Sequence, residues 1–262
     1  MVYKVATFNY QGFTIHYTIE GEGKTIVLLH GLGGSSMNWI YQRNSLKADY
    51  QVISVDLPGH GKSEGADDLT FFDYHQLLRE LLLEELGLRD LVLCGLSMGG
   101  KAAIDFSCRY PEAVRGLVVA DTFASMQKED KKKRKELWDL VHQPGGVDLW
   151  LERVIQQMGL DPDGSIAKGF RKGIETQSPV FLYGLFTQLM DYDQDDQLEV
   201  IQVPSMVLHG EHDEFAPRSC AEELHRGLAN SELCIVPDCG HLPNVEQPQV
   251  FNELLAKFMK RV

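Results

Sequence analysis

The sequence predicts an α/β protein whose core is a mostly parallel, eight-stranded sheet with helices on both faces and one helical insertion. Two observations lead to this fold class. Short, continuously apolar runs rich in β-branched residues recur along the chain, and such runs are typical of strands buried on both faces. Segments with helical spacing of apolar residues lie between these runs, and this alternation of strand and helix indicates a doubly wound sheet.

The N-terminal segment differs from the rest of the predicted sheet. In "VYKVATFNYQGFTIHYTIEGEG", residues 2–23, apolar and polar residues alternate on either side of "YQG". Alternation with a period of two, interrupted by a turn sequence, predicts an antiparallel hairpin. The buried strands follow it, and we expect them at 25–31, 51–56, 90–95, 114–121, 204–210 and 232–238.

Helices are predicted between the strands. In the segment 70–87, Phe71, Tyr74 and Leu78 share one helical face, and Gly87 stands where the helix should end. Further helices are expected at 98–110, 218–229 and 246–260.

One long stretch breaks this rhythm. Residues 122–199 contain no strand-like run, but they do contain helical segments rich in Lys, Leu and aromatic residues. We therefore expect a core domain formed by residues 1–121 and 200–262, with 122–199 inserted as a helical cap (lid). The charged run "KEDKKKRKE", residues 128–136, is most simply a solvated helix face.

Composition and charge exclude several classes of partner. The 262 residues carry a formal net charge of −13 at pH 7, which opposes binding to a nucleic-acid backbone or an anionic membrane surface. The five cysteines include no C-x-x-C pair and favour reduced thiols. No apolar run approaches the roughly 18 residues of a membrane span, and "MVYKVATFNY" lacks the apolar core of a signal peptide. We expect a cytoplasmic monomer or homodimer with no nucleic-acid or membrane partner.

One serine stands between glycines in "CGLSMGG", residues 94–100. It follows a predicted buried strand and precedes a predicted helix, so the chain must reverse its direction within a few residues. Gly95 and Gly99 permit this turn, and Gly100 lets the helix pack closely on the sheet. Such a turn raises the Ser97 side chain above the carboxyl edge of the sheet, where ligands bind in open α/β folds. Ser97 is therefore a candidate nucleophile.

A serine hydroxyl needs a base to take its proton and a third group to orient that base. Folds of this kind supply the three groups in the chain order serine, acid, histidine. Asp213 and His241 each follow a predicted strand, in that order. Both fall where a loop can bring a side chain to the edge that carries Ser97. Asp121, at the end of an earlier strand, is the competing acid.

The charge that develops on a substrate carbonyl oxygen needs hydrogen-bond donors, and backbone N–H groups near the nucleophile can supply them. Met98 begins the predicted helix after Ser97 and offers one such group. "LLHGLGGSS", residues 28–36, forms a glycine-rich turn after the first parallel strand and offers Leu32 N–H as the second. Since both act through the backbone, their side chains should be replaceable.

Taken together, these segments resemble a known set of motifs over roughly residues 12–121 and 200–260. Five segments occur in the order typical of the α/β-hydrolase superfamily: "HGLGGSS", "DLPGHGKS", "GLSMGG", "GEHDEFAP" and "GHLPNVEQP". The resemblance is strongest to small bacterial carboxylesterases and 3-oxoadipate enol-lactonase-like hydrolases.

This resemblance implies the α/β-hydrolase fold, with the insertion in the place of the family's cap. It also implies Ser97 as nucleophile, His241 as base and Asp213 as its orienting acid, with Leu32 and Met98 as oxyanion-hole donors. Related haloalkane dehalogenases and epoxide hydrolases have an aspartate at the position of Ser97. A serine there indicates acyl transfer through an acyl-enzyme, which requires no cofactor.

The leading hypothesis is a serine hydrolase of the carboxylic ester hydrolase type that acts on a small ester or lactone. Carbon–carbon bond hydrolysis of a diketone acid and perhydrolysis can use the same triad. A lyase with a hydrolase-like triad would cleave a bond without forming an acyl-enzyme. A ligand-sensing signalling protein that retains the triad is the alternative from a different class.

The insertion supplies candidate substrate-binding residues. "PVFLYGLFTQLM", residues 179–190, combines with two earlier residues to offer an apolar pocket. The candidates are Trp150, Met158, Phe181, Tyr183 and Phe186. A substrate that carries a carboxylate would also need a cation, and Arg153, Lys168, Arg171 and Lys172 are available in the insertion.

Other reactive residues favour structural interpretations. His209, His212 and Asp213 form an H-x-x-H-D pattern, but histidines at this spacing on a strand-to-loop junction do not naturally face one another, so no metal site is expected. His30 and His60 fit turns better than catalysis. Cys239 fits burial as a small apolar residue.

Overall fold

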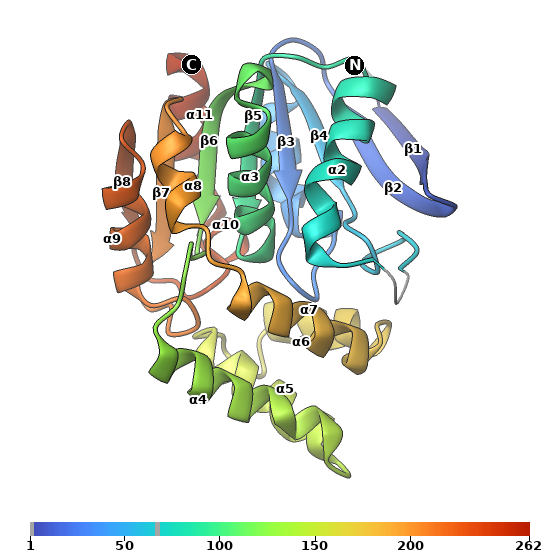
Figure 1. The fold of residues 1–262 in the computed structure, drawn as a ribbon, viewed down its shortest axis with the longest axis vertical. Helices are drawn as coiled ribbons and strands as arrows, with labels where there is room; N and C mark the ends of the chain where they lie inside the picture. The colour runs from blue at the N-terminus through green and yellow to red at the C-terminus, as the bar shows by residue number, and fades with distance from the viewer. Residues whose placement is uncertain (1–2, 66–68) are drawn as a thin grey trace.

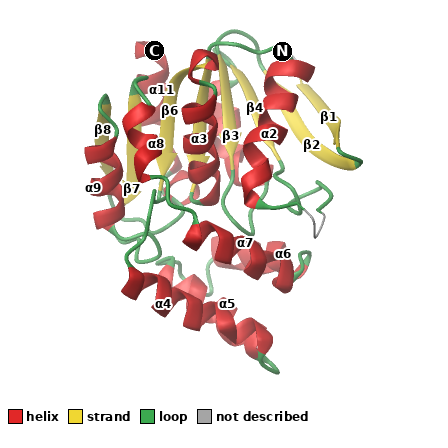
Figure 2. Cartoon of the chain, viewed as in Figure 1, coloured by secondary structure: helices red, strands yellow, loops and turns green. Residues whose placement is uncertain are grey.

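A computed structural model describes residues 3–65 and 69–262, and within them it contains one eight-stranded sheet, with helices on both faces (Figures 1 and 2). The strand order is β1-β2-β4-β3-β5-β6-β7-β8. β2 pairs antiparallel with β1 and β4, and all other pairs are parallel, which confirms the predicted sheet. The strands are β1 Tyr3–Tyr10, β2 Phe13–Glu20, β3 Thr25–Leu29, β4 Gln51–Val55, β5 Leu91–Leu96, β6 Val114–Ala120, β7 Ser205–Gly210 and β8 Ser231–Val236.

The central strands have the burial that their sequences predict. All residues of β3, β5 and β7 are buried, because helices cover both faces of the sheet there. The helices that cover the sheet are α1 Ile40–Leu46, α2 Tyr74–Arg79, α3 Met98–Arg109, α8 Asp195–Val200, α9 Arg218–Gly227, α10 Pro243–Glu246 and α11 Pro248–Arg261.

The predicted helix over 70–87 is interrupted in its hydrogen bonding. After α2 the chain continues as a π-helical segment, Glu80–Glu85, and Leu86 N–H donates to the carbonyl of Leu81 at 3.0 Å. Gly87 follows with a φ of 63°, the left-handed conformation that ends a helix.

The insertion consists of helices in the structure as in the prediction. α4 Lys128–Trp138, α5 Gly146–Gln157, α6 Ser165–Glu175 and α7 Pro179–Asp191 lie below the carboxyl ends of the strands in Figure 1. We call them the lower helical layer. α8 differs, because it lies beside α3 on the sheet. The lower helical layer therefore ends before α8, whereas the boundary expected from the sequence, at residue 199, falls inside α8.

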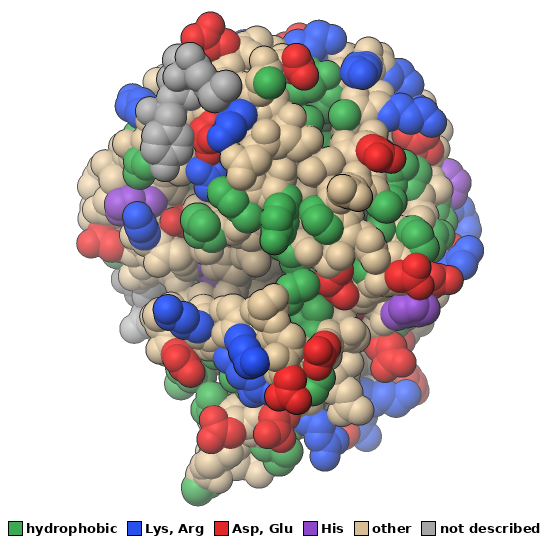
Figure 3. Space-filling view, turned by 180° about the vertical axis from the view of Figure 1, so that it is seen from behind, with side chains coloured by type: hydrophobic (Ala, Val, Ile, Leu, Met, Phe, Trp, Pro, Cys, Tyr) green, Lys and Arg blue, Asp and Glu red, His purple; other side chains and the backbone are tan. Residues whose placement is uncertain are grey.

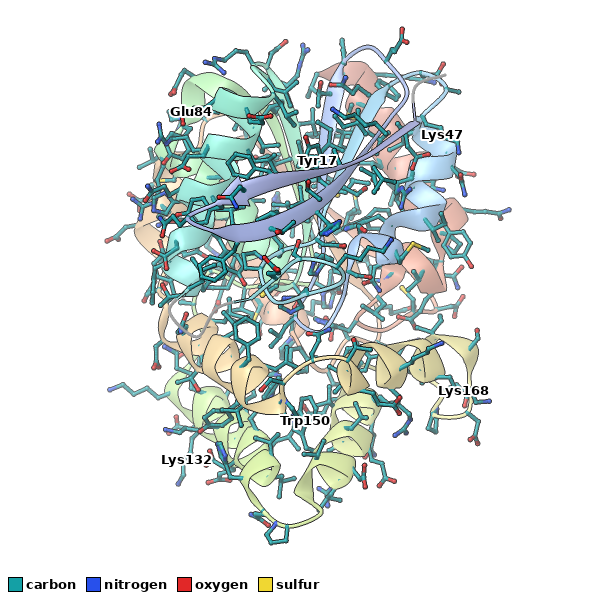
Figure 4. The ribbon with its side chains drawn as sticks, turned by 90° about the vertical axis from the view of Figure 1, so that its right-hand side faces the viewer. Tyr17, Lys47, Glu84, Lys132, Trp150 and Lys168 are labelled. Carbon is teal, nitrogen blue, oxygen red and sulfur yellow. The ribbon has the colours of Figure 1, made fainter. Side chains whose placement is uncertain are left out.

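The interior of the lower helical layer is aromatic. Trp138 stacks on Phe186 with ring centroids 4.2 Å apart, and the ring of Trp150 lies 4.7 Å from that of Trp138. Figure 4 shows Trp150 inside this layer, whereas Lys132 and Lys168 lie at its outside, and both lysines are exposed. Among the described residues, no helix is long and apolar enough to cross a membrane.

Candidate active site

Ser97 stands on a strained turn between β5 and α3. Its φ of 52° and ψ of −115° fall outside the regions that most residues adopt. A Cβ at Gly95 would lie 2.1 Å from the carbonyl oxygen of Gly99, and a Cβ at Gly99 would lie 2.1 Å from that of Leu29. Only glycine allows backbone segments to approach so closely, so these two glycines make the turn possible.

His241 and Asp213 form a buried pair. His241 Nδ1 lies 2.8 Å from Asp213 Oδ2, and both side chains are almost fully buried. Asp213 Oδ1 accepts hydrogen bonds from the backbone N–H groups of Phe215 and Ala216, at 2.7 and 3.0 Å. These bonds fix the carboxylate, and the carboxylate fixes the imidazole, leaving the other ring nitrogen of His241 free for a second partner.

Contact between Asp213 and His241 shifts their two pKa values in opposite directions. Burial alone would raise the pKa of Asp213, but the charge of His241 and hydrogen bonds lower it below the usual value. Burial alone would lower the pKa of His241, but Asp213 outweighs burial and raises it. The pair therefore favours an ionised Asp213 that stabilises a proton on His241.

The loop that carries His241 is tied to the lower helical layer. The backbone N–H of His241 donates to the carbonyl of Met158, at the end of α5, at 2.9 Å. A Cβ at Gly240 would lie 2.0 Å from the same carbonyl oxygen. The position of the imidazole thus depends on α5 as well as on the sheet.

Ser97 and His241 line one cavity of about 40 Å³ below the carboxyl edge of the sheet. Within residues 3–65 and 69–262 no hydrogen bond joins Ser97 Oγ to His241, and such contacts often tighten only when substrate binds. Leu32 and Met98 line the same cavity. As the first residue of α3, Met98 has a backbone N–H with no acceptor inside the helix, as an oxyanion donor requires.

Asp121 lies next to His241 and Asp213. An oxygen of each carboxylate and a ring nitrogen of His241 all lie within 4.8 Å of one another. Asp121 Oδ1 accepts the backbone N–H of Gly210 at 2.8 Å, and its buried Oδ2 has no other hydrogen-bond partner among the described residues. Burial, and then the charge of Asp213, raise the pKa of Asp121 well above the usual value. The raised pKa favours the protonated form of Asp121, which has a proton to direct toward the ionised carboxylate of Asp213.

The other histidines lie in structural positions. His30 Nε2 accepts the backbone N–H of Leu57 at 2.9 Å, and His60 Nδ1 contacts the carbonyl of Pro58 at 2.8 Å. Burial lowers the pKa of His60 to about 3, so it stays neutral. The H-x-x-H-D pattern is not gathered into one site, because His209 is buried beside Asp121 whereas His212 is exposed.

Three of the five predicted substrate-binding residues line the cavity: Trp150, Met158 and Phe186. Among the described residues, Phe181 and Tyr183 do not line it. Phe181 packs edge-on against His60, with ring centroids 6.1 Å apart, and Tyr183 donates its hydroxyl to Asp139 Oδ1 at 2.6 Å. The reason is helical periodicity: the face of α7 that reaches the cavity carries Phe186, Leu189 and Met190.

Sequence reasoning missed Lys101. It lies one helical turn after Ser97 on α3, and this spacing was the available signal. Its Nζ donates to the carbonyls of Ala124, Tyr192 and Phe123, at 2.8, 2.9 and 3.4 Å. Burial lowers its pKa to about 7, and the three carbonyls occupy its donors, so Lys101 offers no free hydrogen-bond donor to a ligand.

None of the four cations proposed from the insertion lines the cavity. Arg153, Lys168 and Lys172 are exposed, and Arg171 is half-buried outside it. Among the described lining residues, therefore, the cavity is apolar apart from Ser97, His241 and the occupied amine of Lys101.

This sheet order, with helices on both faces, defines a protein of the α/β-hydrolase fold. The model of the alpha/beta hydrolase family matches residues 26–254. The chain belongs to that family and is a hydrolase of the α/β-hydrolase type.

Several proteins are similar to it over nearly their whole length. A Bacillus subtilis (strain 168) protein, provisionally named 2-succinyl-6-hydroxy-2,4-cyclohexadiene-1-carboxylate synthase, is 28% identical over 269 residues, covering 95% of this chain and 96% of that protein. The 2-hydroxy-6-oxononadienedioate/2-hydroxy-6-oxononatrienedioate hydrolase of Escherichia coli O81 (strain ED1a) is 28% identical over 265 residues, covering 94% and 91%. A thermophilic esterase from Thermogutta terrifontis, solved with malate bound, has a TM-score of 0.84 at 27% identity, covering 99% of this chain and 98% of that one.

Proposed function

We propose that the protein is a serine esterase that cleaves small esters or lactones through an acyl-enzyme, with Ser97, His241 and Asp213 as its triad. The observation that carries this proposal is the buried 2.8 Å contact between His241 Nδ1 and Asp213 Oδ2, beside a cavity that also exposes Ser97. The lower helical layer closes this cavity from below and would act as the cap.

In the proposed reaction, Ser97 Oγ attacks the substrate carbonyl while His241 takes the serine proton. Asp213 holds the imidazole and stabilises its charge. The backbone N–H groups of Leu32 and Met98 would stabilise the oxyanion. The alcohol leaves with the proton from His241, and water then attacks the acyl-enzyme by the same route, releasing the acid and regenerating Ser97.

The cavity supports a short, uncharged acyl group. Its volume of about 40 Å³ is small, and its lining is apolar. A carboxylate placed there would lose its hydration without gaining a free hydrogen-bond donor from Lys101, because carbonyl groups already occupy that amine. This favours an ester over the carboxylate-bearing compounds in the names of the B. subtilis and E. coli relatives. Carbon–carbon bond hydrolysis, suggested by the E. coli relative's name, is the second candidate.

The proposal predicts a steep dependence on acyl chain length. With p-nitrophenyl esters from acetate to laurate, kcat/KM should fall by roughly tenfold or more between the short and the long acyl groups, because the cavity has no room for the latter. Initial rates by release of p-nitrophenol measure this, with Ser97→Ala assayed in parallel. If the wild type turns over no ester but cleaves a vinylogous diketone acid, the second candidate replaces the first.

Activity should also depend on pH in one direction. A base must be neutral to accept the serine proton, and Asp213 raises the pKa of His241 above 6.5. As pH falls through that raised pKa, kcat/KM should decline by roughly tenfold per pH unit. A pH–rate profile on the best ester tests this, after incubation controls for stability. A rate that stays flat below about pH 6 would contradict His241 as the base.

A further inference from the structure

A second hollow lies beside the candidate active site. It is a groove of about 370 Å³ between the glycine-rich turn after β3, the start of α1 and one side of α6. Gly34, Tyr41, Gly169 and Gln177 are among its lining residues. Figure 3 shows the molecule from behind, hollowed at this level between the body of the sheet and the lower helical layer. We call it the outer groove.

A small cavity of about 30 Å³ lies between the outer groove and the nucleophile. Its lining includes Ser97 and His241, which also line the 40 Å³ cavity, and Asn38 and Leu242, which also line the outer groove. Phe170 of α6 lines all three spaces. Ser97 therefore lies between an enclosed apolar cavity and an open groove, with Phe170 at the junction.

The outer groove differs from the enclosed cavity in chemistry. Its described lining holds no charged side chain, but it offers neutral polar groups on Ser35, Asn38, Tyr41 and Ser165. It suits an uncharged group with several hydrogen-bonding or apolar faces, and it gives no partner to an ionised one.

We infer that the outer groove binds the alcohol part of the substrate, and that this alcohol is uncharged and larger than the acyl part. This inference rests on the proposed esterase function. When the ester C–O bond breaks, the acyl group stays on Ser97 Oγ and His241 gives the serine proton to the departing alcohol oxygen. The group that departs needs a path to solvent, which the outer groove provides, while the group that stays fits the enclosed cavity.

One glycine of α6 allows the groove to be filled selectively. Gly169 is exposed, and a Cβ built there meets no atom within 4 Å. Gly169→Trp should therefore place an indole in the outer groove without displacing the backbone. Gly184 of α7 also has open space around an added Cβ but is not among the described lining residues of the groove, so Gly184→Trp is the matched control.

The test compares two neutral esters of butyric acid, methyl butyrate and 2-phenylethyl butyrate, by titration of the released acid. Gly169→Trp should lower kcat/KM for the phenylethyl ester by roughly tenfold or more and change that for the methyl ester by less than about twofold. Gly184→Trp should change neither. The acyl-length preference on methyl esters should stay as in the wild type.

Two results would overturn the inference. One is an equal effect of Gly169→Trp on both alcohols, and the other is a changed acyl-length preference with an unchanged alcohol preference, which would make the groove the acyl site. Failure of the esterase proposal looks different, because the wild type would then hydrolyse neither ester, or Ser97→Ala would hydrolyse both.

Discussion

Ser97→Ala is expected to lower kcat on the best ester by about 10⁴-fold or more while the protein stays folded. The substitution removes one oxygen atom from a half-buried side chain on the turn between β5 and α3. Alanine and serine both have a Cβ, so the strain of the φ of 52° is present in either protein. What is lost is the proposed nucleophile, and with it the proposed acyl-enzyme that would divide the reaction into two easier steps.

Discontinuous assays at high enzyme concentration measure the residual kcat, and labelling with an active-site acylating probe shows whether residue 97 is still acylated. Matching Tm values and circular dichroism spectra for both proteins are the control for folding. His241→Ala should lose a comparable amount, and the double variant little more, because triad members act as a unit. A folded Ser97→Ala protein that retained a tenth of the wild-type rate would show that another group, or water alone, attacks the substrate.

The sheet could be predicted from the sequence because its central strands appear as short, apolar runs. β3 and β5 are apolar at nearly every position, and burial on both faces explains such runs. The geometry at Ser97 also followed from local chemistry, since Gly95 and Gly99 are required where backbone segments nearly touch. Parallel strands then bring the loops after β5, β7 and β8 to one edge.

The residues that line the cavity could not be predicted from the sequence in the same way. Whether a residue of α7 reaches the cavity depends on how the helix is rotated against its neighbours, and its sequence is apolar on several sides. Phe181 and Tyr183 were therefore as plausible as Phe186, although the first packs on His60 and the second bonds to Asp139. Lys101 was missed for the opposite reason, because a lysine on a helix is expected to be solvated, and here three backbone carbonyls hold it inside.

The sequence leaves open whether Asp213 or Asp121 orients His241, and the geometry of the site favours Asp213. Both carboxylates are buried within reach of His241, but the imidazole Nδ1 contacts Asp213. Two adjacent buried carboxylates do not both ionise readily. The backbone N–H groups of Phe215 and Ala216 and the charge of His241 favour the ionised form of Asp213. Burial and the charge of Asp213 raise the pKa of Asp121 and favour its protonated form.

This arrangement predicts a large loss of activity for Asp213→Asn and a small loss for the same substitution at Asp121. Asp213→Asn should lower kcat/KM by about 10³- to 10⁴-fold, because an amide neither stabilises the imidazolium nor selects the tautomer that leaves Nε2 free to accept the serine proton. Asp121→Asn should lower kcat/KM by less than about tenfold. The amide oxygen of asparagine can accept the Gly210 N–H, and its NH₂ group can donate toward Asp213 in place of a protonated carboxyl.

Steady-state kinetics of the variants on one ester, with Tm as the folding control, distinguishes the role of Asp213 from that of Asp121. Asp121→Ala is the third variant to measure. Alanine removes the donor that asparagine keeps, so it should lower kcat/KM further than asparagine does at the same position. If Asp121→Asn abolished activity and Asp213→Asn retained it, the orienting acid would be Asp121. A loss that was equal in all three variants would mean that His241 depends on the charge of the two carboxylates together rather than on the one that it contacts.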